Sequence, residues 1–567
     1  MRTTPVDRIA RYRSRGWWSD ETVAGLFERA VAAHPSRTAV IDPANREALG
    51  LGAPRRLAFA ELDSAVSAMA AQLVRLGLRP GDVVLAQLPN TWECVALYLA
   101  AARLGVVLSP VAMQYRRHEL GQIAALLEPR AVVTCRAFKE FDHAALAADL
   151  ASEHGAHLLV MASDGAGDAS PPALATGPAS DADVAAVVAV AAPSADDVFT
   201  ICWTSGTEGA PKGVPRSHNQ WLAISHAHFE AARIAPGDKL LNPFPMINMA
   251  AIGGCFLSWL HAAGTLLLHH PFDPQVYLQQ IAVERPQYAI APPAVLNLLI
   301  RDEALLAKVD LSSLRCIGSG SAPLAPAMIA GFRERLGIEV VNLFGSNEGV
   351  SLVSGPDEIP DPERRARYFP RFGRSDVPWP HRVSQSMETR IVDPETGGEI
   401  LEPGRPGELH VRGATVFDGY FKAPEMTQQA FTPDGFFRTG DLFEIAADEQ
   451  GPRYYRFAGR HKQIIVRGGM KISPEELDEI LAACPGLVEG AVVGYPDEVM
   501  GERICAVVVP KPGVEFTVEQ LAAHFESRGA AVFKRPERVR VVTQLPRNPV
   551  GKVARAELLR IALAPQS

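Results

Sequence analysis

Apolar positions in the first part of the chain follow two different periods. Residues 23–31 and 62–76 place apolar side chains at helical spacing, and Gly77 stops the second series, so we expect two helices there. Continuous apolar runs at 83–86 and 131–133 are typical of buried strands, and helical segments lie between them. Strands that alternate with helices predict parallel sheets covered by helices, which is the α/β class.

One segment, 249–268, approaches the apolar content of a membrane span. It is interrupted by Gly253-Gly254, His261 and Gly264, so it lacks the continuous apolar length that a span requires. We therefore expect a buried helix followed by a buried strand. Residues 163–197 are instead rich in small and polar side chains, which predicts a surface excursion.

The pattern of apolar and turn-forming residues changes after about residue 380. Short β-like runs at 389–392 and 408–411 alternate with Gly, Pro and Asp turns, which predicts a small β subdomain over about 380–461. The remaining residues are typical of a separate α+β unit. It opens on Ser473-Pro474-Glu475-Glu476, a capping box with proline at the first helical position, and continues into apolar strands around 491–493 and 504–509. We therefore expect a large domain over 1–461 and a small one over 462–567.

Composition excludes several classes of function. The 567 residues are 47% hydrophobic and 21% charged, as in a soluble globular protein, and their number requires more than one hydrophobic core. The net charge of −8 argues against a nucleic-acid partner and against an anionic membrane surface. The seven cysteines are scattered, which indicates reduced thiols rather than a disulfide frame or a zinc site. Because the N-terminal residues form no signal peptide, we expect a cytoplasmic protein.

The most informative stretch is a short loop directly after the apolar run 198–203. It contains three glycines, three hydroxyl side chains and one lysine, in the order Thr204-Ser205-Gly206-Thr207-Glu208-Gly209-Ala210-Pro211-Lys212-Gly213. Glycines let the backbone approach a ligand closely, and free N–H groups and hydroxyls can cradle a phosphate. The alternative is a solvated turn. The common P-loop is excluded, because Lys212 is followed by Gly213 rather than by Ser or Thr.

This loop resembles the phosphate loop of the adenylate-forming superfamily, which includes acyl-CoA synthetases, luciferases and the adenylation domains of peptide synthetases. Four further motifs match that superfamily in its order along the chain. The resemblance implies that the loop binds the phosphates of ATP and that Thr207 also contacts Mg²⁺. The phosphate contacts implied are Thr204, Ser205, Gly206, Thr207 and Lys212. Glu208 departs from the usual small or hydroxyl residue, and we expect its side chain to point away from the phosphates.

Two motifs resemble the adenine and metal sites of the superfamily. Gly318-Ser319-Gly320-Ser321-Ala322-Pro323 resembles the loop on which the adenine lies, and Phe344-Gly345-Ser346-Asn347-Glu348 resembles the aromatic-Gly-x-Thr-Glu motif. The resemblance implies that Phe344 faces the adenine and that Glu348 helps to hold Mg²⁺. Asn347 replaces the usual threonine, and its amide can still donate to a phosphate oxygen. The nucleotide contacts implied are Gly320, Ser321, Ala322, Phe344, Gly345, Ser346 and Asn347. Taken alone, either stretch could be an exposed turn.

The remaining motifs lie in the last third of the chain. Thr439-Gly440-Asp441 resembles the ribose motif, in which a carboxylate accepts hydrogen bonds from two vicinal hydroxyls, and Arg460 is implied as a second nucleotide contact. Pro546 to Lys552 resembles the loop whose lysine, here Lys552, neutralises the charge that builds during adenylation. The resemblance thus implies Lys552 and Glu348 as catalytic residues. The stretch 459–474 resembles the interdomain hinge and thiol channel, and the residues implied there are Lys462, Arg467, Gly468 and Gly469.

The acid pocket of the superfamily corresponds here to 245–253 and to Leu343. An apolar lining and a leucine at the pocket floor predict an aromatic, alicyclic or short-to-medium-chain acid. Asn248 resembles the asparagine with which aryl-acid adenylating enzymes meet a ring hydroxyl; the alternative is that it only satisfies nearby backbone. The acid contacts implied are Asn248, Met249, Gly253, Gly318 and Leu343.

These expectations combine into an AMP-forming carboxylic acid–CoA ligase. A carboxylate displaces pyrophosphate from Mg-ATP to give an acyl-AMP, and the thiol of coenzyme A then displaces AMP. One alternative is a stand-alone adenylating enzyme that loads the acyl group onto the phosphopantetheine of a carrier protein. Another is an inactive ATP-binding scaffold, against which the retention of Glu348, Asp441, Arg460 and Lys552 speaks.

Overall fold

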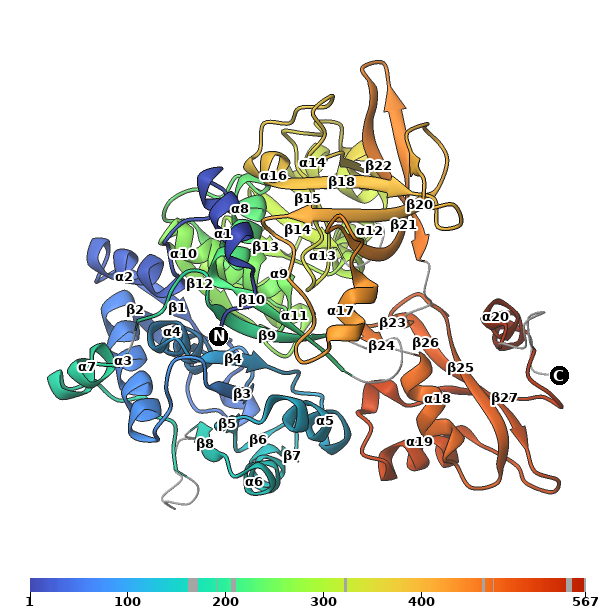
Figure 1. Ribbon diagram of the computed structural model, residues 1–567, viewed down its shortest axis with the longest axis horizontal. Coiled ribbons are helices and arrows are strands. Elements are labelled where there is room, and N and C mark those ends of the chain that lie inside the picture. The colour runs from blue at the N-terminus through green and yellow to red at the C-terminus, as the bar shows by residue number, and fades with distance from the viewer. Residues whose placement is uncertain are drawn as a thin grey trace. The chain divides into compact units, whose positions relative to one another are not determined.

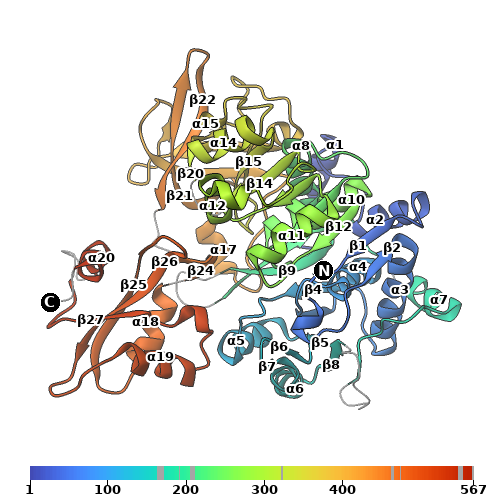
Figure 2. The ribbon, with the colours of Figure 1, turned by 180° about the vertical axis from the view of Figure 1, so that it is seen from behind.

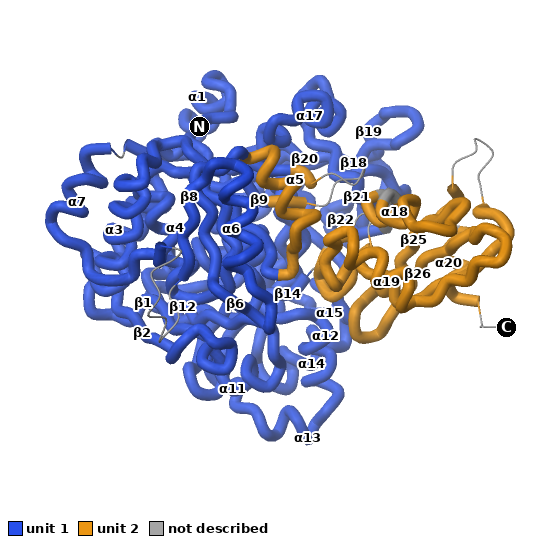
Figure 3. The backbone as a smooth tube through the Cα atoms, turned by 90° about the horizontal axis from the view of Figure 1, so that it is seen from below, with its two compact units in different colours: residues 1–113, 128–202, 213–459 blue, residues 114–127, 203–212, 460–567 orange. Residues whose placement is uncertain are grey.

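The computed structural model describes residues 1–161, 172–190, 192–204, 211–320, 324–460, 465–472, 474–546 and 553–564. Three sheets form the core of a larger unit, which comprises residues 1–113, 128–202 and 213–459 (Figures 1 and 3). A fourth sheet belongs to a second unit, which comprises residues 114–127, 203–212 and 460–567. The predicted class, a large layered α/β part with a β subdomain and an α+β C-terminal part, is confirmed.

An eight-stranded sheet carries the predicted adenine and metal motifs at one edge. Its order is β16 (Ser351–Ser354), β15 (Glu339–Gly345), β14 (Cys316–Gly320), β13 (Tyr288–Ile290), β11 (Lys239–Asn242), β12 (Thr265–Leu268), β1 (Thr38–Ile41) and β2 (Arg56–Ala58). Only the edge strands β16 and β2 run antiparallel to their neighbours. Figure 2 shows α11 (Pro274–Glu284), α12 (Pro293–Arg301) and α14 (Pro326–Leu336) against this sheet, and their apolar side chains share one core with its strands. Burial on both faces explains the continuous apolar runs of the strands.

A second, six-stranded sheet contains the strands that the apolar runs predicted. Its order is β10 (Lys212–Ser217), β9 (Val198–Thr204), β4 (Val107–Pro110), β3 (Val83–Gln87), β5 (Ala131–Cys135) and β8 (His157–Met161). The two predicted helices are also present, as α2 (Val23–Ala33) and α3 (Phe59–Arg75). Thr22 caps α2 by accepting a hydrogen bond from Gly25 N at 3.0 Å, and Gly77 follows α3 with a φ of +82°. The helix α4 (Trp92–Leu104) packs against α3.

The apolar segment 249–268 forms the predicted buried helix and strand. The helix consists of α9 (Met249–Ala251), the π-helical turn η2 (Ile252–Leu257) and α10 (Ser258–Ala262), and β12 follows. It packs against α8 (His218–Ala231). No helix within the described ranges is both long and apolar enough to cross a bilayer. In the predicted surface excursion, residues 162–171 and 191 lie outside the described residues, and the structure adds a helix that the composition did not predict, α7 (Asp181–Val188).

The predicted β subdomain is an antiparallel sheet of six strands. Its order is β17 (Tyr368–Pro370), β22 (Gly451–Arg460), β21 (Phe437–Asp448), β20 (Gly407–Gly413), β18 (Met387–Val392) and β19 (Glu399–Ile400). The helix α17 (Pro424–Ala430) lies between β20 and β21 along the chain. Other elements of the larger unit are α1 (Val6–Ser14), α6 (His143–His154), α13 (Glu303–Leu306), α15 (Pro362–Arg367), α16 (Arg382–Ser386), β6 (Ala137–Phe138) and β7 (Phe141–Asp142).

The second unit has the predicted α+β character. Its sheet contains β24 (Met470–Ile472), β23 (Ile465–Arg467), β26 (Gly501–Pro510), β25 (Leu487–Asp497) and β27 (Arg538–Val541), and its helices are α18 (Pro474–Ala482), α19 (Val518–Ser527), α20 (Arg555–Leu563) and α5 (Arg117–Leu127). The helix α5 belongs here because Lys534 is buried between Glu119, at 3.3 Å, and Glu476, at 2.5 Å. Ser473, the predicted cap of α18, lies outside the described residues.

Candidate active site

The aromatic-Gly motif forms an accessible turn where β15 leaves the sheet. Residues 343–348 are partly exposed, whereas 340–342 and 349–354 are buried. The turn is closed by a hydrogen bond of 2.9 Å from Gly349 N to Ser346 O, and Gly349 has a φ of +107°. A Cβ on Gly349 would lie 2.1 Å from the carbonyl oxygen of Thr415, so only glycine fits there. The fold therefore presents this motif, and little else of the strand, to a ligand.

Glu348 is held at both its backbone and its side chain. Its carbonyl accepts a hydrogen bond of 2.9 Å from Phe417 N, and its carboxylate oxygen Oε1 accepts one of 3.2 Å from the hydroxyl of Tyr420. The residue is partly exposed. Mg²⁺ binds carboxylate oxygens, so a partly exposed carboxylate on a fixed backbone fits the predicted metal.

Two hydrogen-bond donors precede Glu348 in the same turn. The side-chain oxygen of Asn347 accepts a hydrogen bond of 3.0 Å from Met249 N, and no other described residue accepts from its amide nitrogen. The hydroxyl of Ser346 is buried without a hydrogen-bond partner among the described residues. Buried polar groups are normally paired, and an orphaned hydroxyl beside a free amide suits the oxygens of an absent phosphate. The turn thus fits the nucleotide that the motif implies.

Arg216 of β10 supports this turn, and the sequence analysis did not identify it as a site residue. Its guanidinium is fully buried and donates to the carbonyl oxygens of Asn347, at 2.6 Å, and Thr415, at 2.6 Å. Burial lowers the pKa of Arg216 to about 10. A buried cation on carbonyl oxygens fixes the backbone of the turn. The sequence signal that could have identified Arg216 is a single arginine within β10, a strand in which residues 213–217 are buried.

A β-bulge shapes the predicted ribose motif. The pairing of β20 with β21 shifts between Glu408 and His410, so that Thr439-Gly440-Asp441 lies opposite Leu409 alone. The extra residues are held by Gly440, with a φ of +72°, whose N–H donates to the Glu408 carboxylate at 2.9 Å. Bulges re-aim side chains next to active sites, and this one gives Asp441 its direction.

Aromatic packing links the predicted adenine and ribose motifs. The ring of Phe344 lies edge-on to Phe443 at 5.0 Å and close to Phe457 at 5.6 Å. Phe443 follows Asp441 by two residues in β21, so the eight-stranded sheet and the β subdomain meet between the two motifs. The distance between the predicted adenine and ribose contacts is therefore set by a packed aromatic cluster rather than by a loop.

The glycines of β14 serve strand packing. A Cβ on Gly320 would lie 2.1 Å from the carbonyl oxygen of Leu343, and one on Gly318 would lie 2.4 Å from the hydroxyl of Tyr288 and 3.0 Å from Leu343 Cδ1. The bare backbone of β14 lets Leu343 and Tyr288 fill this space. Small residues are therefore required here whether or not an adenine lies on the strand.

The predicted acid pocket lies directly beside the aromatic-Gly turn. Besides the hydrogen bond from Met249 to Asn347, the methyl carbon of Met249 occupies the space beside Gly345, 1.8 Å from where a Cβ would lie. Asn248 caps α9 by accepting from Ala251 N at 3.2 Å, as the backbone alternative predicted. Among the described residues, nothing accepts from the amide nitrogen of Asn248, which leaves it available to a ligand. Gly253 faces Ile224 of α8, with 2.6 Å between a Cβ and Ile224 Cγ2, so packing accounts for this glycine.

Several predicted residues lie in the second unit or outside the described ranges. Thr204 ends β9, Lys212 begins β10, and both belong to the second unit. Arg460 ends β22, but its side chain is not described. Predicted residues outside the described ranges are Ser205, Gly206, Thr207, Glu208, Ser321, Ala322, Lys462 and Lys552.

The predicted thiol-channel residues form a hairpin in the second unit. Gly468 and Gly469, with φ values of +55° and +81°, make the two-residue turn between β23 and β24, a turn that needs positive φ at both positions. Arg467 makes a two-pronged contact with Glu537, at 2.9 and 2.8 Å. Its charge is therefore already balanced within the second unit.

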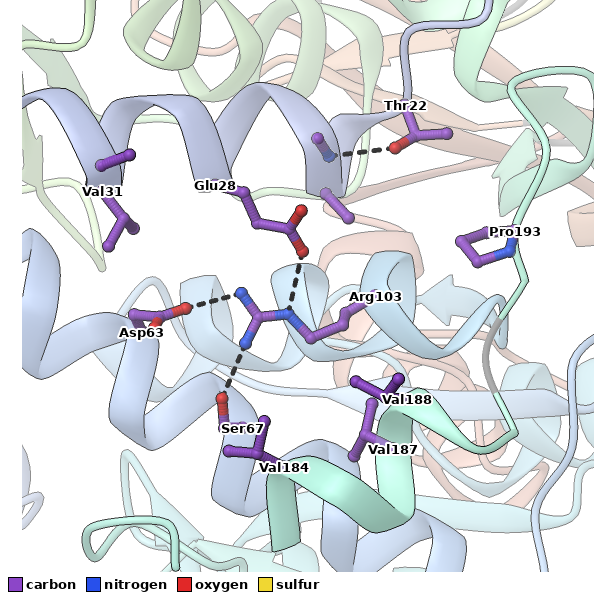
Figure 4. Close-up of a pocket in the computed structure, with 13 residues that line it drawn as sticks. Thr22, Glu28, Val31, Asp63, Ser67, Arg103, Val184, Val187, Val188 and Pro193 are labelled. Carbon is purple, nitrogen blue, oxygen red and sulfur yellow. Dashed lines mark hydrogen bonds and ion pairs between the residues drawn. The ribbon is translucent and has the colours of Figure 1, made fainter. Parts of the chain in front are cut away.

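A separate pocket of about 550 Å³ lies between α2, α3, α4 and α7, and no predicted site residue lines it (Figure 4). Arg103 occupies its centre and contacts Asp63 at 2.6 Å, Ser67 at 2.8 Å and Glu28 at 3.5 Å. The charged groups of this pocket thus satisfy one another, and the aromatic-Gly turn remains the candidate for the active site.

Comparison with known proteins shows the family of the chain. Residues 27–421 match the family described as AMP-binding enzyme, and residues 476–552 match the AMP-binding enzyme C-terminal domain. A 2-hydroxy-7-methoxy-5-methyl-1-naphthoate–CoA ligase from Streptomyces carzinostaticus is 31% identical over 563 residues, which cover 98% of this chain and 95% of that enzyme. A salicyl-AMP ligase / salicyl-S-ArCP synthetase from Mycobacterium tuberculosis is 30% identical over 569 residues, which cover 98% of this chain and 93% of that protein.

A solved structure supports the same relationship. The amide bond synthetase McbA from Marinactinospora thermotolerans has a TM-score of 0.76 and 27% identity, over 94% of this chain and 99% of that one. Motifs, fold and relatives agree over almost the whole chain. The chain therefore belongs to the AMP-binding enzyme family, the adenylate-forming superfamily, whose members use ATP to activate an acid.

Proposed function

We propose that this enzyme is an AMP-forming carboxylic acid–CoA ligase that activates an aromatic or similarly apolar acid. The observation that carries the proposal is the hydrogen bond of 3.0 Å between Met249 N and Asn347 Oδ1. It joins the stretch that corresponds to the acid pocket to the turn that corresponds to the nucleotide site. An acid bound beside Met249 would have its carboxylate next to the α-phosphate, which is the proximity that adenylation requires.

In the first half-reaction, a carboxylate oxygen attacks the α-phosphorus while the bond to pyrophosphate breaks. We assign the ribose hydroxyls to Asp441, the phosphate oxygens to Ser346 and Asn347, and the transition-state charge to Lys552. Glu348 and Thr207 would hold Mg²⁺, which neutralises phosphate charge when bound. The oriented donors of the turn supply stabilisation without reorganising during the reaction.

In the second half-reaction, the thiol sulfur attacks the acyl carbon and AMP leaves. We propose that residues 462–567 rotate about Lys462 between the two steps, withdrawing Lys552 and bringing the Gly468-Gly469 turn to the thiol. Hinges of this kind need only a few residues to absorb the dihedral change. Arg467 is a weaker candidate for the CoA phosphate than its sequence position suggests, because Glu537 already pairs with it.

For the acid, we favour an aromatic ring with a hydroxyl group. The amide nitrogen of Asn248 is available, Asn248 is partly exposed, and the neighbouring Met246 and Met249 are apolar and buried. The names of the two relatives above include a hydroxynaphthoate and a salicyl group. Alicyclic and short-to-medium-chain acids are the next candidates.

A carrier-protein acceptor is the second candidate function. The Mycobacterium tuberculosis relative is named a salicyl-S-ArCP synthetase rather than a CoA ligase, and its identity to this chain is close to that of the CoA ligase. Both functions share the first half-reaction. They differ only in the molecule that carries the acceptor thiol, which is coenzyme A in one and a carrier protein in the other.

Two assays in sequence test the proposal. Pyrophosphate release is first measured over a panel of hydroxyaryl, aryl, alicyclic and aliphatic acids, and we expect the hydroxyaryl acids to have the highest kcat/KM. Turnover of the best acid is then compared with free CoA and with a phosphopantetheinylated carrier. Preference for the carrier would replace the CoA ligase with the second candidate, and acid-independent ATP turnover would exclude both.

A further inference from the structure

The carboxylate of Glu348 is held by a segment distant in sequence, residues 414–420, which we name the strap. Thr415 donates from its hydroxyl to Gly349 O at 2.9 Å, and Phe417 N donates to Glu348 O at 2.9 Å. Tyr420 completes the set by donating to Glu348 Oε1 at 3.2 Å. The strap therefore contacts the turn at three points and reaches the carboxylate itself.

The side chain of Tyr420 is held in one orientation as a hydrogen-bond donor. Its N–H donates to Thr427 Oγ1 of α17 at 2.9 Å, and its ring packs against Phe417 at 4.9 Å, so neither the backbone nor the ring is free to swing. The hydroxyl therefore has a fixed position from which it donates its hydrogen to the carboxylate of Glu348.

The other end of the strap is tied to the N-terminal segment. The buried carboxylate of Asp418 accepts from Arg8 of α1 at 2.6 Å, from Gln220 at 2.8 Å and from the hydroxyl of Thr4. Gln220 also donates to Val416 O at 3.1 Å. Trp18 donates to Ala414 O at 3.2 Å, so the strap is anchored at its first residue as well. These contacts fix the position of the strap, and with it that of Tyr420, relative to the turn.

We propose that Tyr420 is a positioning residue for the metal-binding carboxylate of Glu348, and that Arg8, through Asp418, keeps the strap in register. Groups that hydrogen-bond a metal-ligating carboxylate fix its orientation, and their loss weakens metal binding. The inference rests on the proposed role of Glu348 toward Mg²⁺. It adds a function for the strap and for the first helix of the chain, which none of the five motifs includes.

The test measures metal binding directly as well as activity. Mn²⁺ affinity is measured by electron paramagnetic resonance in the presence of a non-hydrolysable ATP analogue, and the Mg²⁺ requirement is measured by acid-dependent exchange of pyrophosphate into ATP. For Tyr420→Phe we expect Mn²⁺ affinity to fall about tenfold, with excess Mg²⁺ restoring exchange and the KM for the acid unchanged. Arg8→Gln, at a partly exposed side chain, should lower the affinity in the same direction by less.

Tyr455→Phe is the matched control. It removes a buried hydroxyl that contacts Thr389 at 3.0 Å in the same β subdomain but not Glu348, and it should leave the Mn²⁺ affinity unchanged. Glu348→Gln separates the two levels of the proposal. If Glu348→Gln weakens Mn²⁺ binding and Tyr420→Phe does not, the positioning role is wrong. If Glu348→Gln has no effect, the metal role of Glu348 itself is wrong and the strap inference is lost with it.

Discussion

At the scale of single residues, the half-buried carboxylate of Glu408 shapes the predicted ribose site. Glu408 accepts from Gly440 N at 2.9 Å and contacts His410 Nε2 at 3.2 Å. Burial acts to raise the pKa of Glu408, but the hydrogen bonds from His410 and Gly440 outweigh it, so the pKa lies below its usual value. Glu408 is therefore charged at neutral pH and holds the bulge that directs Asp441.

Replacing Glu408 by Gln should raise the KM for ATP. The amide keeps the shape of the side chain but loses the charge that attracts Gly440 N–H and His410, a loss of about 1 kcal/mol that corresponds to about fivefold. Steady-state kinetics with varied ATP and saturating acid provide the measurement. Glu444→Gln, in β21, the strand that contains Gly440 and Asp441, and paired with Arg456 at 2.5 Å, is the control that should leave this KM unchanged. An equal rise in both variants would show that the strand, and not the bulge, was disturbed.

A second residue-scale effect concerns pH. His218 is buried, its Nδ1 accepts from Val23 N at 3.2 Å, and burial lowers its pKa from 6.5 to about 4. The folded state therefore keeps His218 neutral, while the unfolded chain binds a proton below pH 6.5. Stability from this group is complete above that pH and is lost as pH falls toward 4, by about 1.4 kcal/mol per pH unit.

We expect His218→Asn to flatten the acid side of the stability curve. Asparagine keeps an acceptor near the position of Nδ1 but does not titrate, so denaturant unfolding between pH 7 and 5 should show a smaller loss than in the parent protein. His157→Asn, at an exposed position, is the control and should retain the parent slope. Parallel curves for the parent and His218→Asn would contradict the assignment.

At the scale of elements, the packing of β14 against β15 sets the predicted depth of the acid pocket. Leu343 fills the space left by Gly318 and lies close to Tyr288, and Leu343 itself is partly exposed. A side chain at this strand position thus both packs the sheet and limits the room beyond Met249. Neither strand could be shortened without losing the register Gly318↔Val341 and Gly320↔Leu343.

Leu343→Gly should extend the range of acids accepted toward longer chains. The substitution removes four carbon atoms from the predicted pocket floor, and it should cost about 2 kcal/mol of stability because the space is not refilled. The kcat/KM values over a series of aliphatic acids are the measurement. Leu343→Met preserves the volume and should keep the parent profile. An unchanged profile in Leu343→Gly would place the pocket floor elsewhere.

At the scale of the whole molecule, the chain contributes to its two units from several separate segments. The second unit takes 114–127 and 203–212 in addition to 460–567. Its charged side chains Glu119, Glu476 and Lys534 are buried together, so removing Lys534 takes away the cation that the two carboxylates share. Thr204 and Lys212, the described residues at the two ends of the predicted phosphate contacts, fall in this same unit.

Lys552→Ala should separate the two half-reactions. We expect adenylation, followed by pyrophosphate exchange, to fall by about 10²–10³-fold because a cation is lost where charge develops. Thiolation of a supplied acyl-AMP should proceed at nearly the parent rate, since the proposed rotation has already withdrawn this lysine. Lys511→Ala, in the same unit and outside every motif, is the control. Equal loss of both steps would assign Lys552 a structural role.

The sequence by itself determined the class of each layer, the family and the positions of the motifs. Helical and strand periods depend on neighbouring residues, so α2, α3, β3 and β5 were predictable, as was the buried helix after Met249. The motifs were equally readable, because each lies within a few consecutive residues. The helix α7 was not, because its small residues carry no clear apolar period.

Only the tertiary structure decided which groups support the site. Arg216 is 131 residues from Asn347, Tyr420 is 72 from Glu348, and Glu408 is 32 from Gly440. Such contacts depend on how distant strands meet, and no local pattern records them. The same holds for Asn248, whose type suggested a ligand while the fold assigned its oxygen to Ala251 N. The residue types that each motif needs thus lie at consecutive positions of the sequence. The orientation of their side chains depends instead on packing between segments far apart in the chain.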